Sequence, residues 1–168
     1  SALAFSGAVM QMIAHGLITP GLFMIAGLLQ MRLHTRDLAK MGGLWAIIPR
    51  CGAMGMFFAL AALGMPGLAG FIGEFLVLAG SFALHSAYAV IAALGMIVSV
   101  IYALQLVQRA FHGDPGGLRR VADFSTQEMG VLGVLAVLIV LFGLYPQLVF
   151  QLLAAAPAIT AHLAEAAP

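Results

Sequence analysis

Charged residues are absent from long stretches of this chain. Residues 1–31 and 129–164 contain no Asp, Glu, Lys or Arg, and both stretches exceed the roughly 20 residues with which an α-helix crosses a bilayer. Residues 51–108 contain one charged side chain, Glu74, and are long enough for two crossings. The pattern therefore predicts membrane-spanning segments joined by short polar connections.

We expect four transmembrane helices, at residues 7–31, 52–84, 87–108 and 128–150. The alternation of polar and apolar positions that membrane β-strands require is missing. The predicted fold class is therefore all-α integral membrane, with one helix bundle over residues 1–150. Residues 151–168 form an Ala-rich tail, which we expect to fray or to pack against a partner.

The second predicted span is too long for one straight crossing and has helix-breaking residues in its middle. Residues 64–70 read Gly-Met-Pro-Gly-Leu-Ala-Gly. Because proline removes a backbone donor and glycine tolerates non-helical torsions, we expect a break in mid-membrane at Gly64, Pro66, Gly67 and Gly70. Such breaks mark ion and substrate sites in transporters. A proline kink, or close helix packing through small residues, would explain the same pattern without a site.

Two titratable side chains are predicted well inside the spans. Glu74 follows the break by about one helical turn, and His15 lies in the first span. An acid inside a membrane costs about 2.5–3.5 kcal/mol on insertion scales, so its presence indicates a function. Imidazole titrates near neutral pH, which suits a proton relay. The alternatives are a static ion pair for Glu74 and an interhelical hydrogen bond for His15.

Further polar side chains are spaced so that they share helix faces. Gln11, His15 and Thr19 recur every four residues and form one stripe on the first span. On the third span, Ser99, Tyr102 and Gln105 recur every three residues. We interpret them as relay or support groups for proton movement, while hydrogen bonding between helices is the alternative.

The amino-acid composition argues against several other classes of protein. A chain that is 63% hydrophobic and 8% charged is not a soluble globule. The net charge of +1, without a basic cluster, argues against nucleic-acid binding. The single cysteine, Cys51, is too few for a structural zinc site or an iron–sulfur cluster. One deep histidine is too few for haem held between two axial ligands. We expect no cofactor bound by this chain.

The basic residues predict how the chain is oriented. Lys and Arg gather in two connections, residues 32–50 and 109–128. An even number of predicted spans separates the two connections, so they lie on the same side. Because Lys and Arg are retained in the cytoplasm, we expect both connections there and the C-terminus outside.

Several short motifs recur in an order that resembles a known family. They are Ile-Ala-His-Gly-Leu at 13–17, His-Thr-Arg-Asp at 34–37, Gly-Gly-Leu at 42–44, Gly-Met-Pro-Gly at 64–67 and Phe-Ile-Gly-Glu-Phe at 71–75. From about residue 7 to 150, the chain resembles the C-terminal part of the subunit M family, antiporter-like subunits of bacterial NADH-quinone oxidoreductase (respiratory complex I). Related antiporter-like subunits typically carry lysine where this chain has Glu74, which favours subunit M.

The resemblance implies a proton-pumping subunit of the bacterial inner (plasma) membrane. Glu74 and His15 would belong to a chain of buried ionisable groups that crosses the membrane arm. The implied partners are the other membrane-arm subunits and the lipid bilayer. NADH, FMN, iron–sulfur clusters and quinone would be bound by other subunits. The upstream helices, which carry the family's buried lysines, are not in this sequence.

Two kinds of alternative stay open at this point, and a third lacks support. Mrp-type cation/proton antiporters and membrane subunits of energy-converting hydrogenases share the implied fold. A purely structural assembly subunit would use the same polar groups to lock helices together. A stand-alone ion channel would need a filter signature, which the sequence does not contain.

Overall fold

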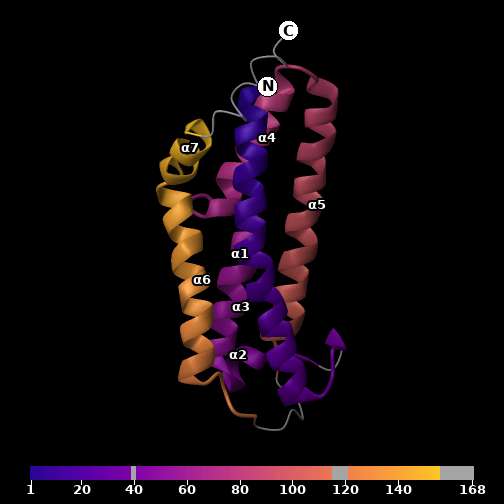
Figure 1. Ribbon diagram of the computed structural model, residues 1–168. Coiled ribbons are helices and arrows are strands. Elements are labelled where there is room, and N and C mark those ends of the chain that lie inside the picture. Colours follow the sequence, from indigo (N-terminus) through magenta and orange to yellow (C-terminus); the bar gives the residue numbers. More distant parts are fainter. Residues whose placement is uncertain (39–40, 115–120, 156–168) are drawn as a thin grey trace.

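The computed structural model describes residues 1–38, 41–114 and 121–155 (Figure 1). These residues form helices and contain no strand, which confirms the all-α class for the described part of the chain. The predicted tail beyond residue 155 lies outside the described residues. The helices are α1 (Ala2–Leu33), α2 (Leu44–Ile47), α3 (Pro49–Ala62), α4 (Ala69–Phe82), α5 (Ser86–Phe111), α6 (Thr126–Leu144) and α7 (Gln147–Ala154).

Three of these helices, α1, α5 and α6, are long and apolar enough to cross a membrane. They correspond to the first, third and fourth predicted spans. The second predicted span is divided between α3 and α4, which have 14 residues each. A helix of that length extends about 21 Å and does not cross a hydrocarbon core of about 30 Å by itself.

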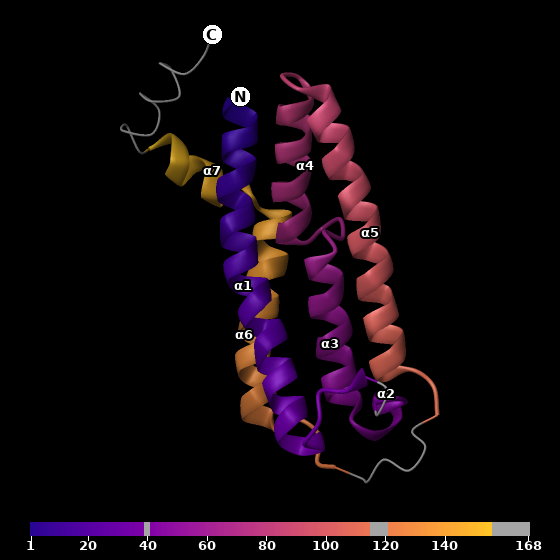
Figure 2. The ribbon, with the colours of Figure 1, turned by 90° about the vertical axis from the view of Figure 1, so that its right-hand side faces the viewer.

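The long helices run side by side, and α3 and α4 follow one another end to end between α1 and α5 (Figure 2). The N-terminus of α1 and the C-terminal end of α4 lie at one end of the molecule. The short helix α2 and the start of α3 lie at the other (Figures 1 and 2). The most extensive helix pair is α1 with α4. The ends of α3 and α4 therefore meet midway along the bundle.

The C-terminus of α3 is closed by a Schellman motif that its sequence specifies. Gly64 has a φ of 65°, a left-handed torsion that glycine adopts without steric cost. Its N–H donates to the carbonyl of Ala61 at 3.3 Å, and the N–H of Met65 donates to the carbonyl of Leu60 at 3.2 Å. This pair of hydrogen bonds satisfies carbonyls that the helix end would leave free.

A tight turn follows directly and leads into α4. The N–H of Leu68 donates to the carbonyl of Met65 at 3.1 Å, with Pro66 and Gly67 at the two central positions. Gly67 has a φ of 92°, and proline followed by a positive-φ glycine is the pattern of a type II turn. Gly64, Pro66 and Gly67 therefore lie in the connection between α3 and α4. Gly70, which we also expected in the break, is instead the second residue of α4.

The fourth predicted span differs from the observed helix at its C-terminal end. The sequence predicts helix to residue 150, but α6 ends at Leu144 and α7 begins at Gln147. Pro146 disfavours helical torsions at Tyr145, which has a φ of −126° and a ψ of 61°. The predicted boundary at 150 is therefore wrong. The short helix α7 also crosses the predicted boundary between bundle and tail.

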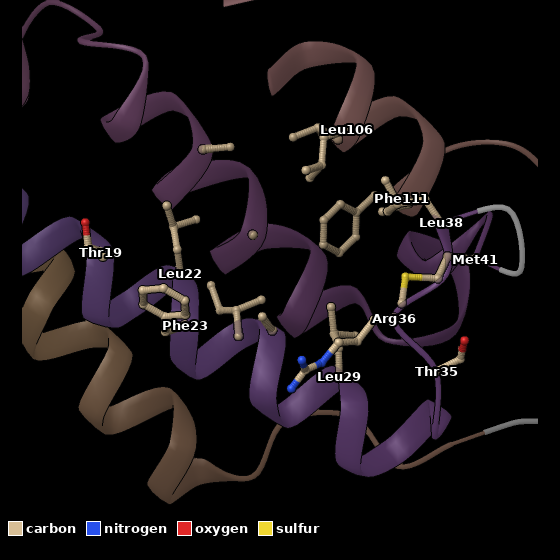
Figure 3. Close-up of a pocket in the computed structure, with 16 residues that line it drawn as sticks. Thr19, Leu22, Phe23, Leu29, Thr35, Arg36, Leu38, Met41, Leu106 and Phe111 are labelled. Carbon is tan, nitrogen blue, oxygen red and sulfur yellow. The ribbon is translucent and has the colours of Figure 1, made fainter. Parts of the chain in front are cut away.

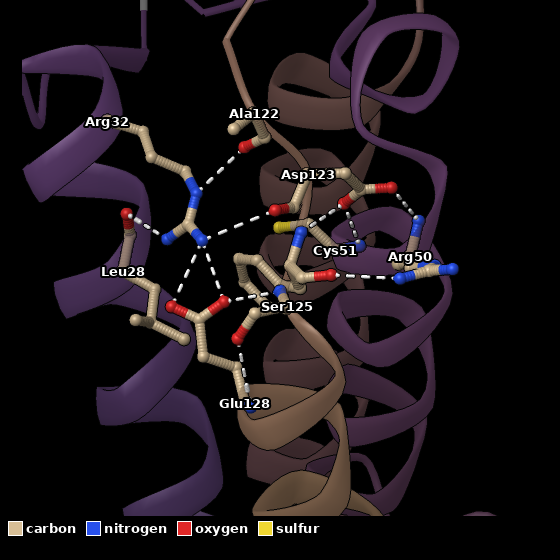
Figure 4. A network of polar contacts seen from close by, with 9 residues as sticks. Leu28, Arg32, Arg50, Cys51, Ala122, Asp123, Ser125 and Glu128 are labelled. Atoms are coloured by element: carbon tan, nitrogen blue, oxygen red, sulfur yellow. Dashed lines mark hydrogen bonds and ion pairs between the residues drawn. The ribbon is translucent and has the colours of Figure 1, made fainter.

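At the end of the bundle opposite the N-terminus, Arg32 joins α1 to the segment before α6 (Figure 4). Its guanidinium donates to both carboxylate oxygens of Glu128, at 2.7 and 3.0 Å, and to the carbonyl of Ala122 at 2.8 Å. It also lies 5.0 Å from the ring centroid of Phe124. Glu128 in turn forms a capping box with Ser125 at the start of α6. We call these residues the Arg32 network.

The same segment also caps α3. Ile48 precedes α3 and offers no side-chain acceptor to its free N–H groups. The carboxylate of Asp123 accepts hydrogen bonds from the N–H groups of Arg50 at 2.9 Å and Cys51 at 3.2 Å. A negative charge at a helix N-terminus is favoured by the helix dipole. The segment before α6 therefore fixes the ends of α1 and α3 together.

Candidate proton-carrying site at the helix break

Glu74 lies at the junction of α3 and α4. It is on α4, one turn and a half after the helix begins at Ala69, and side chains on a helix lean toward its N-terminus. The carboxylate accordingly reaches back to the connection, where a Cβ built on Gly64 would overlap with Oε2 of Glu74. The half-buried carboxylate therefore lies directly against the backbone of the break.

Gln11 of α1 is the hydrogen-bond partner of Glu74. Its Nε2 donates to Oε1 of Glu74 at 3.3 Å. The contact is possible because α1 and α4 approach closely: a Cβ on Gly73 would lie 2.7 Å from the backbone nitrogen of Gln11. The other end of the amide, Oε1 of Gln11, is buried and has no hydrogen-bond partner among the described residues. Gln11 is therefore the residue of the first-span stripe that contacts Glu74.

The remaining residues of the stripe are arranged differently. The imidazole of His15 is exposed on the described part of the chain, and its ring nitrogens lie 3.1 and 3.3 Å from the hydroxyl of Thr19. His15 and Thr19 are therefore paired with each other. The described residues bring Gln11, and not His15, to Glu74.

The polar face predicted on the third span does not reach the break either. Ser99, Tyr102 and Gln105 all lie on the exposed side of α5, and the hydroxyl of Ser99 donates to the carbonyl of Gly95 in its own helix. No hydrogen bond joins these side chains to Glu74 within the described chain. Their assignment to a relay stays a prediction.

A separate cavity of about 440 Å³ lies between α1, α3 and α5. Figure 3 shows its wall of apolar side chains, among them Leu22, Leu29 and Phe111. Its polar lining residues are Thr19, Thr35 and Arg36. Because the lining contains no carboxylate and no histidine, this cavity adds no proton-accepting group to the site.

Gly143 of α6 also forms part of the site, although the sequence pattern does not single it out. A Cβ at this position would overlap with the carbonyl oxygen of Gly67 and lie 2.6 Å from the Cα of Leu68. Helix α6 therefore packs its backbone directly on the connection between α3 and α4. A glycine in an apolar helix was the only signal, and α6 has further glycines at 130 and 133 with open space beside them.

The arrangement suits one kind of chemistry. A carboxylate with one neutral hydrogen-bond donor, set against irregular backbone, can take up and release a proton without a cofactor. Among the described residues, no group of three His, Cys, Asp or Glu side chains lies close enough to hold a metal ion.

Substitution of Gly64 is expected to disturb Glu74 without a change in the acid itself. In Gly64→Ala, the left-handed torsion costs about 1–2 kcal/mol, and the new methyl group overlaps with the Glu74 carboxylate. We expect a lower rate of proton uptake in membranes that contain the full-length protein. Gly95→Ala is the matched control because a Cβ there meets nothing within 4 Å. Equal uptake in the two variants would contradict this geometry.

Comparison with known proteins finds relatives that share one name. The chain is 44% identical over 155 residues to NADH-quinone oxidoreductase subunit M of Pseudomonas aeruginosa, a match that covers 92% of this chain and 30% of the relative. It is 43% identical over 150 residues to subunit M of Escherichia coli K12, and this match covers 88% of this chain and 30% of that protein. The chain thus spans about a third of the length of the curated relatives it matches, and the resemblance to subunit M is confirmed.

Solved structures agree with these relatives. A chain of respiratory complex I from Thermus thermophilus matches with a TM-score of 0.76 and 36% identity, over 86% of this chain and 32% of that one. A chain of an archaeal membrane-bound sulfane sulfur reductase matches with a TM-score of 0.76 and 25% identity, over 85% and 24%. Residues 1–101 match the family model described as NADH:quinone oxidoreductase/Mrp antiporter, TM. The chain therefore belongs to the NADH:quinone oxidoreductase/Mrp antiporter transmembrane family.

Proposed function

We propose that this chain is the C-terminal part of a proton-translocating membrane subunit of an NADH:quinone oxidoreductase, with Glu74 as a proton-carrying group. One observation carries the proposal: the Glu74 carboxylate lies against the backbone of the α3–α4 connection and accepts a hydrogen bond from Gln11 of α1. The 43–44% identity to subunit M relatives supports the assignment of the complex.

The proposed membrane arrangement has four crossings within residues 1–150, and the second is broken. Helices α1, α5 and α6 each cross once, while α3 and α4 together form the remaining crossing. The connection 63–68 then lies at membrane depth, where irregular backbone is tolerated beside protein or a hydrated cavity. Connections 32–50 and 109–128 face the cytoplasm of a bacterial inner membrane, and the tail 151–168 lies outside.

The proposed mechanism is electrostatic and conformational. Chemistry elsewhere in the complex moves charge along the membrane arm and changes the proton affinity of Glu74. Moving one charge across a membrane costs about 2.3 kcal/mol per 100 mV, which a shift of one to two pKa units can supply. The connection with Gly64 and Gly67 acts as the gate beside the acid. His15, paired with Thr19, is proposed as a further proton-carrying group.

The proposed partners are other membrane-arm subunits and the lipid bilayer. Electron transfer takes place in other subunits, which bind NADH, FMN, iron–sulfur clusters and quinone, so this chain contributes translocation and no redox centre. The exposed apolar side chains on α5, including Tyr88, Ile97 and Val98, are consistent with a helix that faces lipid or another membrane segment.

A second candidate function is supported by one comparison. The sulfane sulfur reductase chain has the same TM-score as the complex I chain, so the fold alone also fits a membrane subunit of another respiratory complex or an Mrp-type antiporter. In that case ion movement would not depend on NADH. NADH-driven uptake in native membranes separates the two candidates.

The test of the proposal is Glu74→Gln in the full-length protein in its native host. We expect a normal amount of intact complex together with loss of NADH-driven proton uptake into membrane vesicles, because glutamine keeps the shape but cannot ionise. Normal uptake would exclude Glu74 from the proton path. Loss of the complex itself would instead favour a structural assembly subunit.

A further inference from the structure

The side-chain amide of Gln11 contacts Glu74 through its NH₂ group, while its oxygen has no hydrogen-bond partner among the described residues. Nε2 donates to Oε1 of Glu74 at 3.3 Å, an arrangement that requires Oε1 to carry no proton, because an oxygen that receives this hydrogen bond acts as the acceptor. Oε1 of Gln11 is buried without a partner in the described part of the chain. Buried polar atoms are seldom left unpaired, and an exception calls for an explanation.

Protonation of Glu74 at Oε1 converts a hydrogen-bond acceptor into a hydrogen-bond donor. A protonated carboxyl carries an O–H group, which must find an acceptor when it is removed from water. Oε1 of the Gln11 amide is a buried acceptor without a partner among the described residues. Because the NH₂ group and the oxygen of an amide have nearly the same size, rotation about the terminal side-chain bond exchanges them within the same space.

The backbone keeps this pair in register during such a rotation. Gly73 lets α1 approach until its absent Cβ would lie 2.8 Å from the Cα of Gln11. The absent Cβ of Gly7, one turn earlier on α1, would lie 2.7 Å from the backbone nitrogen of Val77 on α4. Two glycines, one on each helix, therefore fix the separation of α1 and α4 around Gln11. Only the side chain remains to respond to the charge on Glu74.

We infer that Gln11 is a positioning residue that serves both protonation states of Glu74 by rotating its amide. With the acid ionised, Nε2 donates to the carboxylate. When a proton binds to Oε1 of Glu74, the amide turns and Oε1 of Gln11 accepts a hydrogen bond from the new O–H. The proton stays on Glu74 throughout, and Gln11 carries none. This inference rests on the proposed function, since it assumes that Glu74 is protonated and deprotonated in turnover.

The test uses the complete complex and the variant Gln11→Leu. Leucine removes donor and acceptor together while keeping a good helix former. We expect NADH-driven proton uptake to fall about tenfold, the factor that corresponds to about 1.4 kcal/mol for one hydrogen bond. Gln108→Leu is the matched control, because Gln108 is an exposed glutamine of α5. If Gln11→Leu does not assemble, Gln11→Met, which is unbranched, takes its place.

Infrared difference spectra between low and high pH separate the rotating amide from a static link between helices. In the unsubstituted complex we expect a side-chain amide band to change together with the Glu74 carboxyl band. Both changes should vanish in Glu74→Gln. In Gln11→Leu the amide change should vanish and the carboxyl band should move, because its hydrogen bond is lost. Gln108→Leu should leave both bands in place.

The outcomes distinguish this inference from the proposed function. If Glu74→Gln pumps normally, the proposed function fails. If Glu74→Gln loses pumping while Gln11→Leu pumps normally and keeps the Glu74 band unchanged, the inference on Gln11 fails and the proposed function stands. An amide band that stays constant while Glu74 titrates would likewise overturn the rotation.

Discussion

Gly143→Val is expected to destabilise the protein and to reduce proton uptake at the same time. A Cβ at Gly143 overlaps with the backbone of Gly67 and Leu68. Overpacking typically costs about 1–3 kcal/mol, and we expect the upper end because backbone atoms have no rotamer that relieves the overlap. Helix α6 and the connection must move apart, which displaces the backbone against which Glu74 lies.

Gly133→Val is the control within the same helix, because a Cβ there meets nothing within 4 Å. Both variants place the same β-branched side chain in α6. The measurement is the fraction of full-length complex that stays intact after heating, together with proton uptake in membranes. Equal stability and equal proton uptake in the two variants would show that the contact between α6 and the connection does not hold the backbone beside Glu74 in place.

Arg32→Leu is expected to cause the second large effect, a loss of stability. The Arg32 and Glu128 side chains are 16% and 24% exposed, so this pair is partly buried and lies between a surface ion pair and a buried one. Leucine leaves Glu128 and the carbonyl of Ala122 without their charged donor. We expect less intact complex after heating, because α1 is released from the segment before α6.

Arg109→Leu is the matched control for this change. It also removes one arginine from the same end of the bundle, so both variants alter the charge that sets membrane orientation equally. Arg109 is exposed and makes no hydrogen bond or ion pair with the described residues. An equal loss of stability in both variants would show that charge at this end matters and that the Arg32 network does not.

The sequence predicts a helical segment well where its position depends on residues within that segment. Charge-free stretches locate α1, α5 and α6, since a membrane excludes charged side chains. Gly64, Pro66 and Gly67 locate the connection, because each restricts or extends the torsions of its own residue. The end of α6 was missed although Pro146 signalled it, since hydropathy continues through Tyr145 into α7. The short helix α2 lies in a connection that was predicted only as a loop.

The contacts of the site depend on which face of each helix meets a neighbour, and that information is weak in this chain. A helix surrounded by lipid is apolar on all sides, so periodicity groups Gln11 with His15 but does not say which one faces α4. The structure turns Gln11 toward Glu74 and leaves His15 exposed within the described residues. Long-range partners such as Asp123 and the start of α3 are likewise set by packing.

We propose that Glu74, held between Gln11 and the α3–α4 connection, carries protons. The most direct test is the number of protons translocated per NADH oxidised by purified complex in liposomes, measured for the unsubstituted protein and for Glu74→Gln. We predict a lower number for Glu74→Gln, with the complex intact and electrons still transferred to quinone. An unchanged number of protons per NADH would contradict the claim.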